Sequence, residues 1–253
     1  IHKEELPEEE YRRYFGGTGF AAKKLLIELE PGIDPLEPEN VVVFAAGPLT
    51  GGPFAGTGRI SVSAKSPLTD GFGTAEGGGF FGAEMRRAGF DAVVVRGKSE
   101  TPVYLFLHDG TAEIRDASRL VGKTTHEAET IIKEELGDRL VRVSQCGVAG
   151  EKLVRFAGVA NDVTHYAGRT GIGAVMGSKN LRAIAARGKQ SVSVRDRDAV
   201  RKLSAWMNEN WKALAYGLYD TGTAGGVMAL NAASGLPTRN FREGIFEGAE
   251  KIS

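Results

Sequence analysis

A glycine-dense stretch from Asp70 to Met85 constrains the fold of this chain more than any other feature. At its centre are Gly77, Gly78 and Gly79, where no Cβ atom blocks another molecule, so backbone N–H groups can converge on an anion. A short helix is predicted to follow, and its N terminus would add partial positive charge. The stretch therefore predicts a phosphate-binding loop.

The same pattern recurs 91 positions later without gaps, where Gly82 aligns with Gly173 and Gly77 with Gly168. The second glycine loop begins at Tyr166. Each copy is predicted to contain a glycine loop, a short helix and an apolar strand that ends in Arg-Gly-Lys. Two such copies about a pseudo-twofold axis would place the loops side by side, which suits a ligand with two phosphates. Two tight turns left by an old duplication are the alternative interpretation.

Charge and composition narrow the classes of function. The 253 residues include 32 basic and 32 acidic ones, so no basic surplus indicates a nucleic acid partner. No apolar run approaches the roughly 20 residues that cross a bilayer, and the first residues are too charged for a signal peptide. The single cysteine, Cys146, excludes an internal disulfide and a thiolate metal site made by this chain alone. We therefore expect a cytoplasmic protein with no membrane partner.

The periodicity predicts an α+β fold: a duplicated, β-rich domain of two related halves, with sheets flanked by helices, followed by the start of an α-helical domain. Strands are predicted over residues 41–46, 59–64, 91–96, 103–107, 112–115, 140–144, 153–159 and 181–186. The Asp109-Gly110 pair between the strands at 103–107 and 112–115 predicts a tight hairpin turn. Helices are predicted over residues 8–15, 20–29, 198–214 and 221–231, and between a capping box at Thr124–Glu127 and Gly137. The predicted domains are residues 1–190 and 191–253.

Several further segments follow one another in a characteristic order between Glu10 and Gly188. They are Phe44–Gly51, Lys65–Thr69, Gly79–Glu84, Ala88–Ala92, Glu113–Ser118 and Ala167–Leu181, with a weaker match over Gly235–Phe241. In identity, order and spacing, these segments resemble the N-terminal domain of the tungsten-containing aldehyde ferredoxin oxidoreductases. In that family the domain is a platform beneath a tungsten ion held by two molybdopterin dithiolenes, and a magnesium ion links the two pterin phosphates.

The resemblance implies roles for named residues. Arg59 would contact a phosphate, which its guanidinium fork suits. The implied cofactor contacts are Arg59, Glu76, Gly77, Gly78 and Gly79 in the first half and His165, Tyr166, Ala167, Gly168 and Arg169 in the second. Glu76 and Tyr166 would hold the magnesium ion through main-chain carbonyls, and the Glu76 carboxylate is a further candidate ligand.

Three positions depart from the family pattern: Glu76 replaces an asparagine, His165 an arginine and Tyr166 an alanine. A carboxylate beside two phosphates repels them unless a cation or a proton compensates. A histidine contacts phosphate more weakly than an arginine at neutral pH unless the anion keeps it protonated. These departures predict a divergent branch of the family and leave the substrate open.

The resemblance implies a parent enzyme that oxidises an aldehyde to a carboxylic acid and passes electrons through a 4Fe-4S cluster to ferredoxin. The ligands of the cluster and the groups that face tungsten would lie outside residues 1–253. We therefore expect no catalytic residue in this chain, and a chain that is inactive and free of pterin when isolated. A homo-oligomer is compatible with the sequence.

Other functions remain open from the sequence alone. A different tungstopterin enzyme, such as an aromatic thioester reductase of the benzoyl-CoA type, would use the same platform. A nucleotide-binding module is an alternative of another class, because the glycines at Gly171, Gly173 and Gly177 resemble a loosened dinucleotide fingerprint. A pterin-free scaffold that serves only as an interaction domain is the third alternative.

Overall fold

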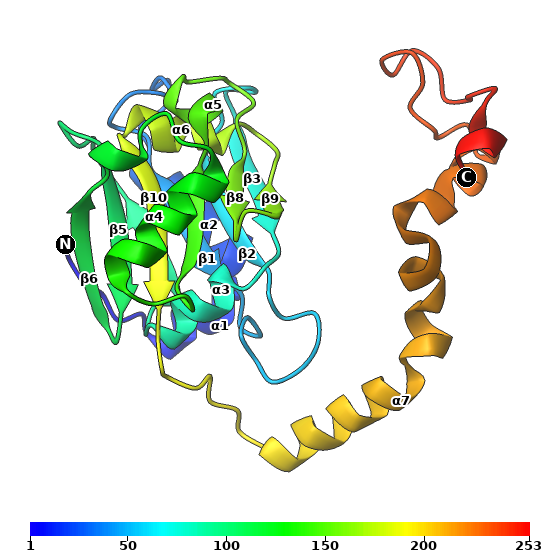
Figure 1. The fold of residues 1–253 in the computed structure, drawn as a ribbon, viewed down its shortest axis with the longest axis horizontal. Coiled ribbons are helices and arrows are strands. Elements are labelled where there is room, and N and C mark those ends of the chain that lie inside the picture. The colour runs from blue at the N-terminus through cyan, green and yellow to red at the C-terminus, as the bar shows by residue number, and fades with distance from the viewer. The chain divides into compact units, whose positions relative to one another are not determined.

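The computed structural model describes all 253 residues, which divide into two compact units, Ile1–Arg195 and Asp196–Ser253. The first unit is an α+β fold with two sheets (Figure 1). The second is mainly helical and contains α7 (Arg197–Thr221), α8 (Val227–Ala232) and the 3-10 helices Gly222–Gly226 and Ala249–Ile252. None of the helices has the length and apolar character needed to cross a bilayer.

The smaller sheet of the first unit has four strands in the order β3-β2-β1-β4, and every neighbouring pair is antiparallel. The larger sheet has six strands in the order β6-β5-β10-β7-β8-β9, and only the β10–β5 pair is parallel. The strands are β1 (Val42–Ala46), β2 (Ile60–Lys65), β3 (Phe72–Gly77), β4 (Ala92–Val95), β5 (Val103–His108), β6 (Thr111–Asp116), β7 (Arg142–Cys146), β8 (Val159–Asn161), β9 (His165–Ala167) and β10 (Leu181–Arg187).

The two sheets share a common arrangement over four strands each. Strands β10-β7-β8-β9 have the same order and antiparallel pairing as β4-β1-β2-β3. Helix α3 (Phe81–Arg87) follows β3, and helix α6 (Ile172–Ser178) follows β9. The bounds of these two helices differ by the 91 positions of the sequence repeat. The repeat therefore corresponds to equivalent elements of the two sheets.

The remaining helices of the first unit are α1 (Glu8–Tyr14), α2 (Gly17–Glu28), α4 (Thr125–Leu136) and α5 (Val148–Glu151), with a 3-10 turn at Ser118–Leu120. The predicted capping box is confirmed. The Thr124 side chain accepts a hydrogen bond from the Glu127 backbone amide, and the Glu127 side chain accepts one from the Thr124 backbone amide. Gly137 ends α4 in the left-handed conformation, as glycine does at many helix C termini. The Asp109–Gly110 hairpin turn is also confirmed, with positive φ at both residues.

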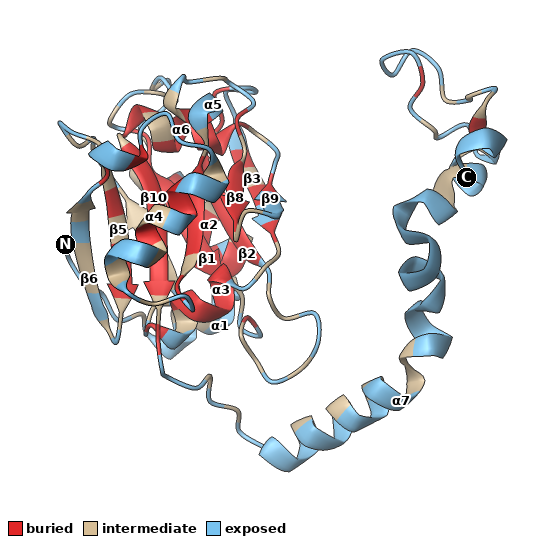
Figure 2. Ribbon diagram, in the orientation of Figure 1, coloured by how far each residue is buried: buried red, intermediate tan, exposed pale blue.

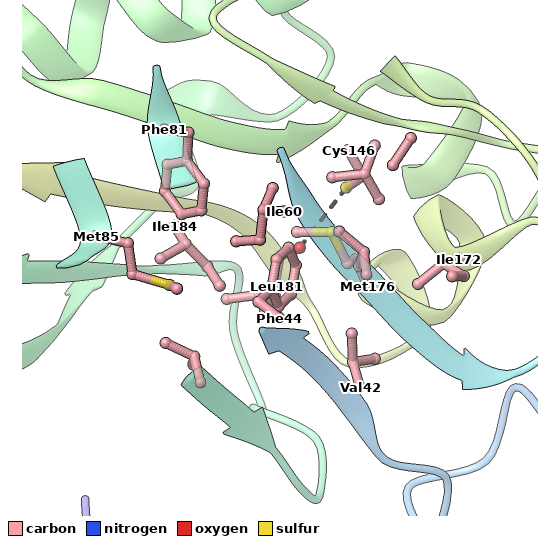
Figure 3. Close-up of a cluster of buried hydrophobic side chains, with 14 of the residues drawn as sticks. Val42, Phe44, Ile60, Phe81, Met85, Cys146, Ile172, Met176, Leu181 and Ile184 are labelled. Carbon is pink, nitrogen blue, oxygen red and sulfur yellow. Dashed lines mark hydrogen bonds between the residues drawn. The ribbon is translucent and has the colours of Figure 1, made fainter. Parts of the chain in front are cut away.

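Alternate residues of the central strands face different layers. On β1, Val42 and Phe44 join the main core, which both sheets share with α3 and α6, while Val43 packs with α2 on the other face. On β10, Ile184 belongs to the main core and Ala183 packs under α4. Figure 2 shows these strands as buried on both faces, which explains their continuous apolar sequences. Figure 3 shows the main core, where β1, β2, β10, α3 and α6 meet.

Several predicted segments differ from the structure. The second glycine loop, expected to begin at Tyr166, overlaps strand β9, which ends at Ala167. Residues Phe72–Gly77, expected as part of a glycine loop, form strand β3. Gly73 and Gly77 allow other parts of the chain to approach the strand closely, and they do not interrupt it. Residues 153–159, expected as a strand, are mostly a loop after the unpredicted helix α5. Leu153 adopts a φ of 56°, and the Ala157 carbonyl accepts a hydrogen bond from Gly173 N at 2.9 Å, so this segment supports α6.

Lys179 is buried without a carboxylate partner. Its side-chain ammonium donates to the carbonyls of Pro38 and Gly97, at 3.0 and 2.9 Å, and the residue is only 2% exposed. Burial lowers the pKa of Lys179 to about 8, although the negative charge of Glu39 acts in the opposite direction.

We expect this lysine to make stability rise with pH just above neutrality. Between pH 8 and 9 the unfolded chain keeps a proton on Lys179 that the folded chain loses, so this lysine raises the free energy of unfolding by about 1 kcal/mol between pH 7.5 and 9. From about pH 8 the buried Cys146 offsets part of this gain, because the unfolded thiol loses its proton near its ordinary pKa of 9.0 while burial raises the pKa of the folded thiol to about 11. Urea unfolding at both pH values tests this, and the Lys179→Met variant should lose the increase. An equal increase in both proteins would contradict it.

Candidate functional site

The structure brings the two predicted glycine loops together. A Cβ atom built on Gly78 would lie 3.1 Å from His165 Cδ2, and one built on Gly79 would lie 3.4 Å from His165 Nδ1. One built on Gly77 would lie 3.2 Å from the Ala167 amide nitrogen. The first loop, at the C-terminal end of β3, therefore lies against the β8–β9 hairpin of the other half.

The glycines of these loops fall into two classes. Gly77 and Gly79 are required by the protein itself, because a Cβ atom would meet Asn161 Nδ2 at 2.5 Å or Asp162 Oδ2 at 2.7 Å, and Gly79 has a φ of +87°. Gly168 is different: the nearest atom to its Cβ position is Tyr166 Cβ at 3.8 Å. At Gly78 the only obstacle within 4 Å is the His165 ring. Packing and turn geometry thus account for Gly77 and Gly79, and leave Gly78 and Gly168 accessible to a ligand.

The N terminus of α3 is not open to an external phosphate. The Asp162 carboxylate oxygen Oδ2 accepts hydrogen bonds from Phe80 N at 2.6 Å and from Phe81 N at 3.1 Å. The sequence-based expectation that this helix end adds its charge to the phosphate site is therefore wrong. A carboxylate of the same chain already satisfies these amides.

Cationic side chains border the accessible glycines. Arg59 precedes β2, has a side chain that is 70% exposed, and lies 3.9 Å from the Glu76 carboxylate on the adjacent strand. A surface pair of this kind contributes little stability, so the Arg59 guanidinium can rearrange toward a ligand. Arg169 is exposed and forms no ion pair, and the exposed His165 has Nδ1 3.0 Å from Thr164 Oγ1. These groups can donate charge-assisted hydrogen bonds to a phosphate.

The remaining predicted residues differ in exposure. Tyr166 is 55% exposed on β9, where it pairs with Ala160, while Ala167 is fully buried and offers only its backbone. Glu76 is exposed on β3 and pairs with Ser61. All ten predicted residues therefore lie at or beside the β3–β9 junction, on segments of the two halves that contact each other.

No group of three or more His, Cys, Asp or Glu side chains in the chain could hold a metal ion. A magnesium ion here would therefore depend on main-chain and ligand oxygens, which this hard cation accepts. Cys146 offers no thiolate, because it is fully buried, its Sγ lies 3.6 Å from Leu181 O, and burial raises the pKa of its thiol to about 11.

The glycines that resemble a dinucleotide fingerprint serve packing. Cβ atoms on Gly171, Gly173 or Gly177 would overlap the carbonyl oxygens of Arg155, Gly158 or Gly150. These glycines let α6 approach α5 and the 153–158 loop at backbone contact distance. No space is left there for a pyrophosphate group, so the nucleotide-binding alternative loses its main support.

Comparison with known proteins decides the family. Residues 1–188 match the family model described as the aldehyde ferredoxin oxidoreductase, N-terminal domain. The chain belongs to the aldehyde ferredoxin oxidoreductase family. Its resemblance to this family, drawn from sequence segments, is thereby confirmed.

Known proteins match nearly the whole chain. It is 46% identical to the tungsten-containing aldehyde ferredoxin oxidoreductase of Pyrococcus abyssi (strain GE5 / Orsay), with 100% of this chain and 42% of that protein aligned. It is 33% identical, over 99% of its length, to the aliphatic sulfonate oxidoreductase, WOR-like subunit, of Pyrococcus furiosus. The chain thus spans about 42% of the length of these relatives.

A solved structure shares the fold. The active site complex BamBC of benzoyl coenzyme A reductase, in complex with 1,5-dienoyl-CoA, superposes with a TM-score of 0.79 and 38% sequence identity. The match covers 82% of this chain and 32% of that chain. The chain is thus similar to enzymes that are named for different substrates.

Two residues at the junction were missed by the sequence analysis: Asn161 and Asp162. Asn161 is fully buried and its Nδ2 donates to Gly78 O at 3.1 Å, while Asp162 holds the α3 amides. The sequence contains one signal for them: the polar pair Asn161-Asp162 follows apolar residues, and Asn161 lies four positions before the predicted site residue His165.

Proposed function

We propose that this chain forms the cofactor platform of a tungsten-containing oxidoreductase, with a tungsten bis-molybdopterin cofactor whose phosphates lie over the β3–β9 junction. The observation that supports the proposal is that two accessible glycines, Gly78 and Gly168, lie on loops of the two halves that meet where β3 contacts β9. Arg59 and Arg169 border them as exposed cations. Two phosphate groups, one per loop, match this arrangement in number and charge.

In this proposal the residues of the chain bind and orient the cofactor. Arg59, His165 and Arg169 donate to phosphate oxygens, and the Gly78 and Gly168 backbones come close to them. Gly77, Gly79 and Ala167 fix the shape of the loops. Main-chain oxygens of Glu76 and Tyr166 would hold a magnesium ion, and Arg59, 3.9 Å from the Glu76 carboxylate, would compensate the charge of this acidic side chain near the phosphates.

The proposed reaction of the whole protein is oxidation of an aldehyde to a carboxylic acid. Water supplies the added oxygen, and two protons and two electrons leave the substrate. The tungsten cofactor supplies the two-electron redox chemistry when bound. The electrons would pass through a 4Fe-4S cluster to ferredoxin, with the cluster ligands and catalytic groups on residues outside this chain.

A second candidate is the platform of an aromatic thioester reductase. It is favoured by the 38% identity and the TM-score of 0.79 to the benzoyl coenzyme A reductase complex. Because the same junction would hold the cofactor in both enzymes, substrate choice lies with residues outside this chain.

Gly168→Ala tests the platform without disturbing the fold. Since a methyl group at this position meets nothing closer than 3.8 Å, the variant should fold as the native chain does. It should weaken binding of magnesium pyrophosphate, used here as a diphosphate probe, by about tenfold, which corresponds to about 1.4 kcal/mol. Isothermal titration calorimetry measures the affinity.

The matched control is Gly217→Ala, the same chemical change in α7, where nothing lies within 4 Å of the added atom. It should leave pyrophosphate affinity unchanged. Equal affinities of Gly168→Ala and the native chain would contradict ligand approach at Gly168.

A further inference from the structure

Two turns cross from one half of the fold to the glycine loop of the other. At the end of β8, Asn161 Nδ2 donates to Gly78 O, and Asp162 Oδ2, in the residue after the strand, accepts from Phe80 N and Phe81 N. These contacts span about 80 positions of sequence, as the donor and acceptor numbers show. They hold the first loop on both sides of Gly79, at the Gly78 carbonyl before it and at the Phe80 and Phe81 amides after it.

The opposite turn makes the equivalent contact. After β2, Ser66 Oγ donates to Thr170 O of the second loop at 2.8 Å, while it accepts from Leu68 N and Thr69 N at 3.1 Å each. Strands β2 and β8 occupy corresponding places in their sheets. Each half therefore forms hydrogen bonds to the glycine loop of the other half from the end of a corresponding strand, β2 or β8.

These contacts are kept at a local cost in stability. Asn161 Oδ1 and Asp162 Oδ1 are buried side-chain oxygens without hydrogen-bond partners, which costs free energy. Asp162 and the β-branched Val163 have φ values of 47° and 65°, and Thr170 has a φ of 62°. Such left-handed residues are strained, and strain of this kind gathers at sites that need a fixed geometry.

We propose that Asp162, supported by Asn161, is a positioning residue that fixes the first glycine loop in its ligand-receptive shape before the cofactor arrives, with Ser66 as its counterpart at the second loop. This inference rests on the proposed function. A loop that is ordered in advance loses less conformational entropy on binding, so the affinity for the phosphates increases.

The direction in which phosphate affinity changes when Asp162 is removed shows whether this residue positions the loop or only lies near the site. Asp162 is an anion beside a site for anions, so its removal by electrostatics alone would tighten phosphate binding. Loss of a positioning contact has the opposite effect and weakens binding. Asp162→Ala therefore distinguishes the two roles by direction as well as by size.

The experiment measures amide hydrogen exchange and magnesium pyrophosphate affinity on the full chain. In Asp162→Ala, we expect the Phe80 and Phe81 amides to exchange at least about tenfold faster and the dissociation constant to rise about tenfold. Asp162→Asn keeps an acceptor oxygen without the charge and should restore most of both properties. Ser66→Ala should weaken pyrophosphate binding in the same direction.

Thr124→Ala is the matched control, because it removes a helix cap elsewhere in the same unit. It should leave the Phe80 and Phe81 amides and the pyrophosphate affinity as in the native chain. Unchanged or tighter pyrophosphate binding by Asp162→Ala would overturn the positioning role, and so would unchanged exchange at Phe80 and Phe81. If the native chain does not bind pyrophosphate, the proposed platform fails, while the exchange rates still decide whether Asp162 orders the loop.

Discussion

Replacing Arg182 by methionine is expected to lower the free energy of unfolding of the first unit by about 3–5 kcal/mol. Arg182 is 2% exposed on β10, and its Nε lies 2.7 Å from Glu151 Oε1. Its guanidinium also donates to Gln145 Oε1 and Lys123 O, each at 3.0 Å, and to Cys146 O. Methionine would remove the donor to these oxygens and the cation beside the partly buried Glu151 carboxylate, which would keep only the hydrogen bond from Gly122 N.

Circular dichroism during urea unfolding measures this loss. Tryptophan fluorescence would not, because Trp206 and Trp211 both lie on α7 in the second unit. The double variant Arg182→Met, Glu151→Met removes both charges and should recover part of the loss. Arg201→Met, which breaks an exposed pair with Asp198, should change stability by less than about 0.5 kcal/mol. A similarly small effect at Arg182 would show that the buried pair contributes no more than a surface one.

Gly177→Ala is expected to destabilise the first unit by about 3 kcal/mol or more. The added methyl group would overlap the Gly150 carbonyl, where α6 crosses α5. Neither backbone can yield without moving α6, whose residues Ile172, Val175 and Met176 belong to the main core. The same urea titration measures the effect.

Gly217→Ala again serves as the control, since alanine favours a helix over glycine by up to about 1 kcal/mol and nothing obstructs it in α7. Native-like stability of Gly177→Ala would mean that α6 can shift away from α5. The tight crossing would then not be the reason for glycine at Gly173 and Gly177.

Local signals in the sequence predicted the elements that local interactions determine. The Thr124–Glu127 capping box and the Asp109–Gly110 turn depend on neighbours within a few residues, and both are present. The repeat of 91 positions predicted the equivalence of α3 and α6, because duplicated elements keep their order. Membership of the family followed from segments distributed along the first unit.

The errors arose where distant residues decide the structure. Phe72–Gly77 contains two glycines and is followed by Gly78 and Gly79, a composition typical of a loop. Its glycines instead accommodate Ser66, Asn161 and Thr170, and the segment pairs as β3. The role of Asp162 depends on a contact with Phe80 and Phe81 about 80 positions away. No period or local motif encodes such a contact.

The most direct test of the platform is a titration of magnesium pyrophosphate into the isotopically labelled chain, followed by amide chemical shifts in NMR spectra. The account predicts that the largest changes occur at Gly78 and Gly168 and at their neighbours His165 and Arg169. Smaller changes should follow at the Phe80 and Phe81 amides that Asp162 holds. Changes confined to other parts of the chain, or no changes at saturating ligand, would contradict the assignment of the two loops as one phosphate-binding site.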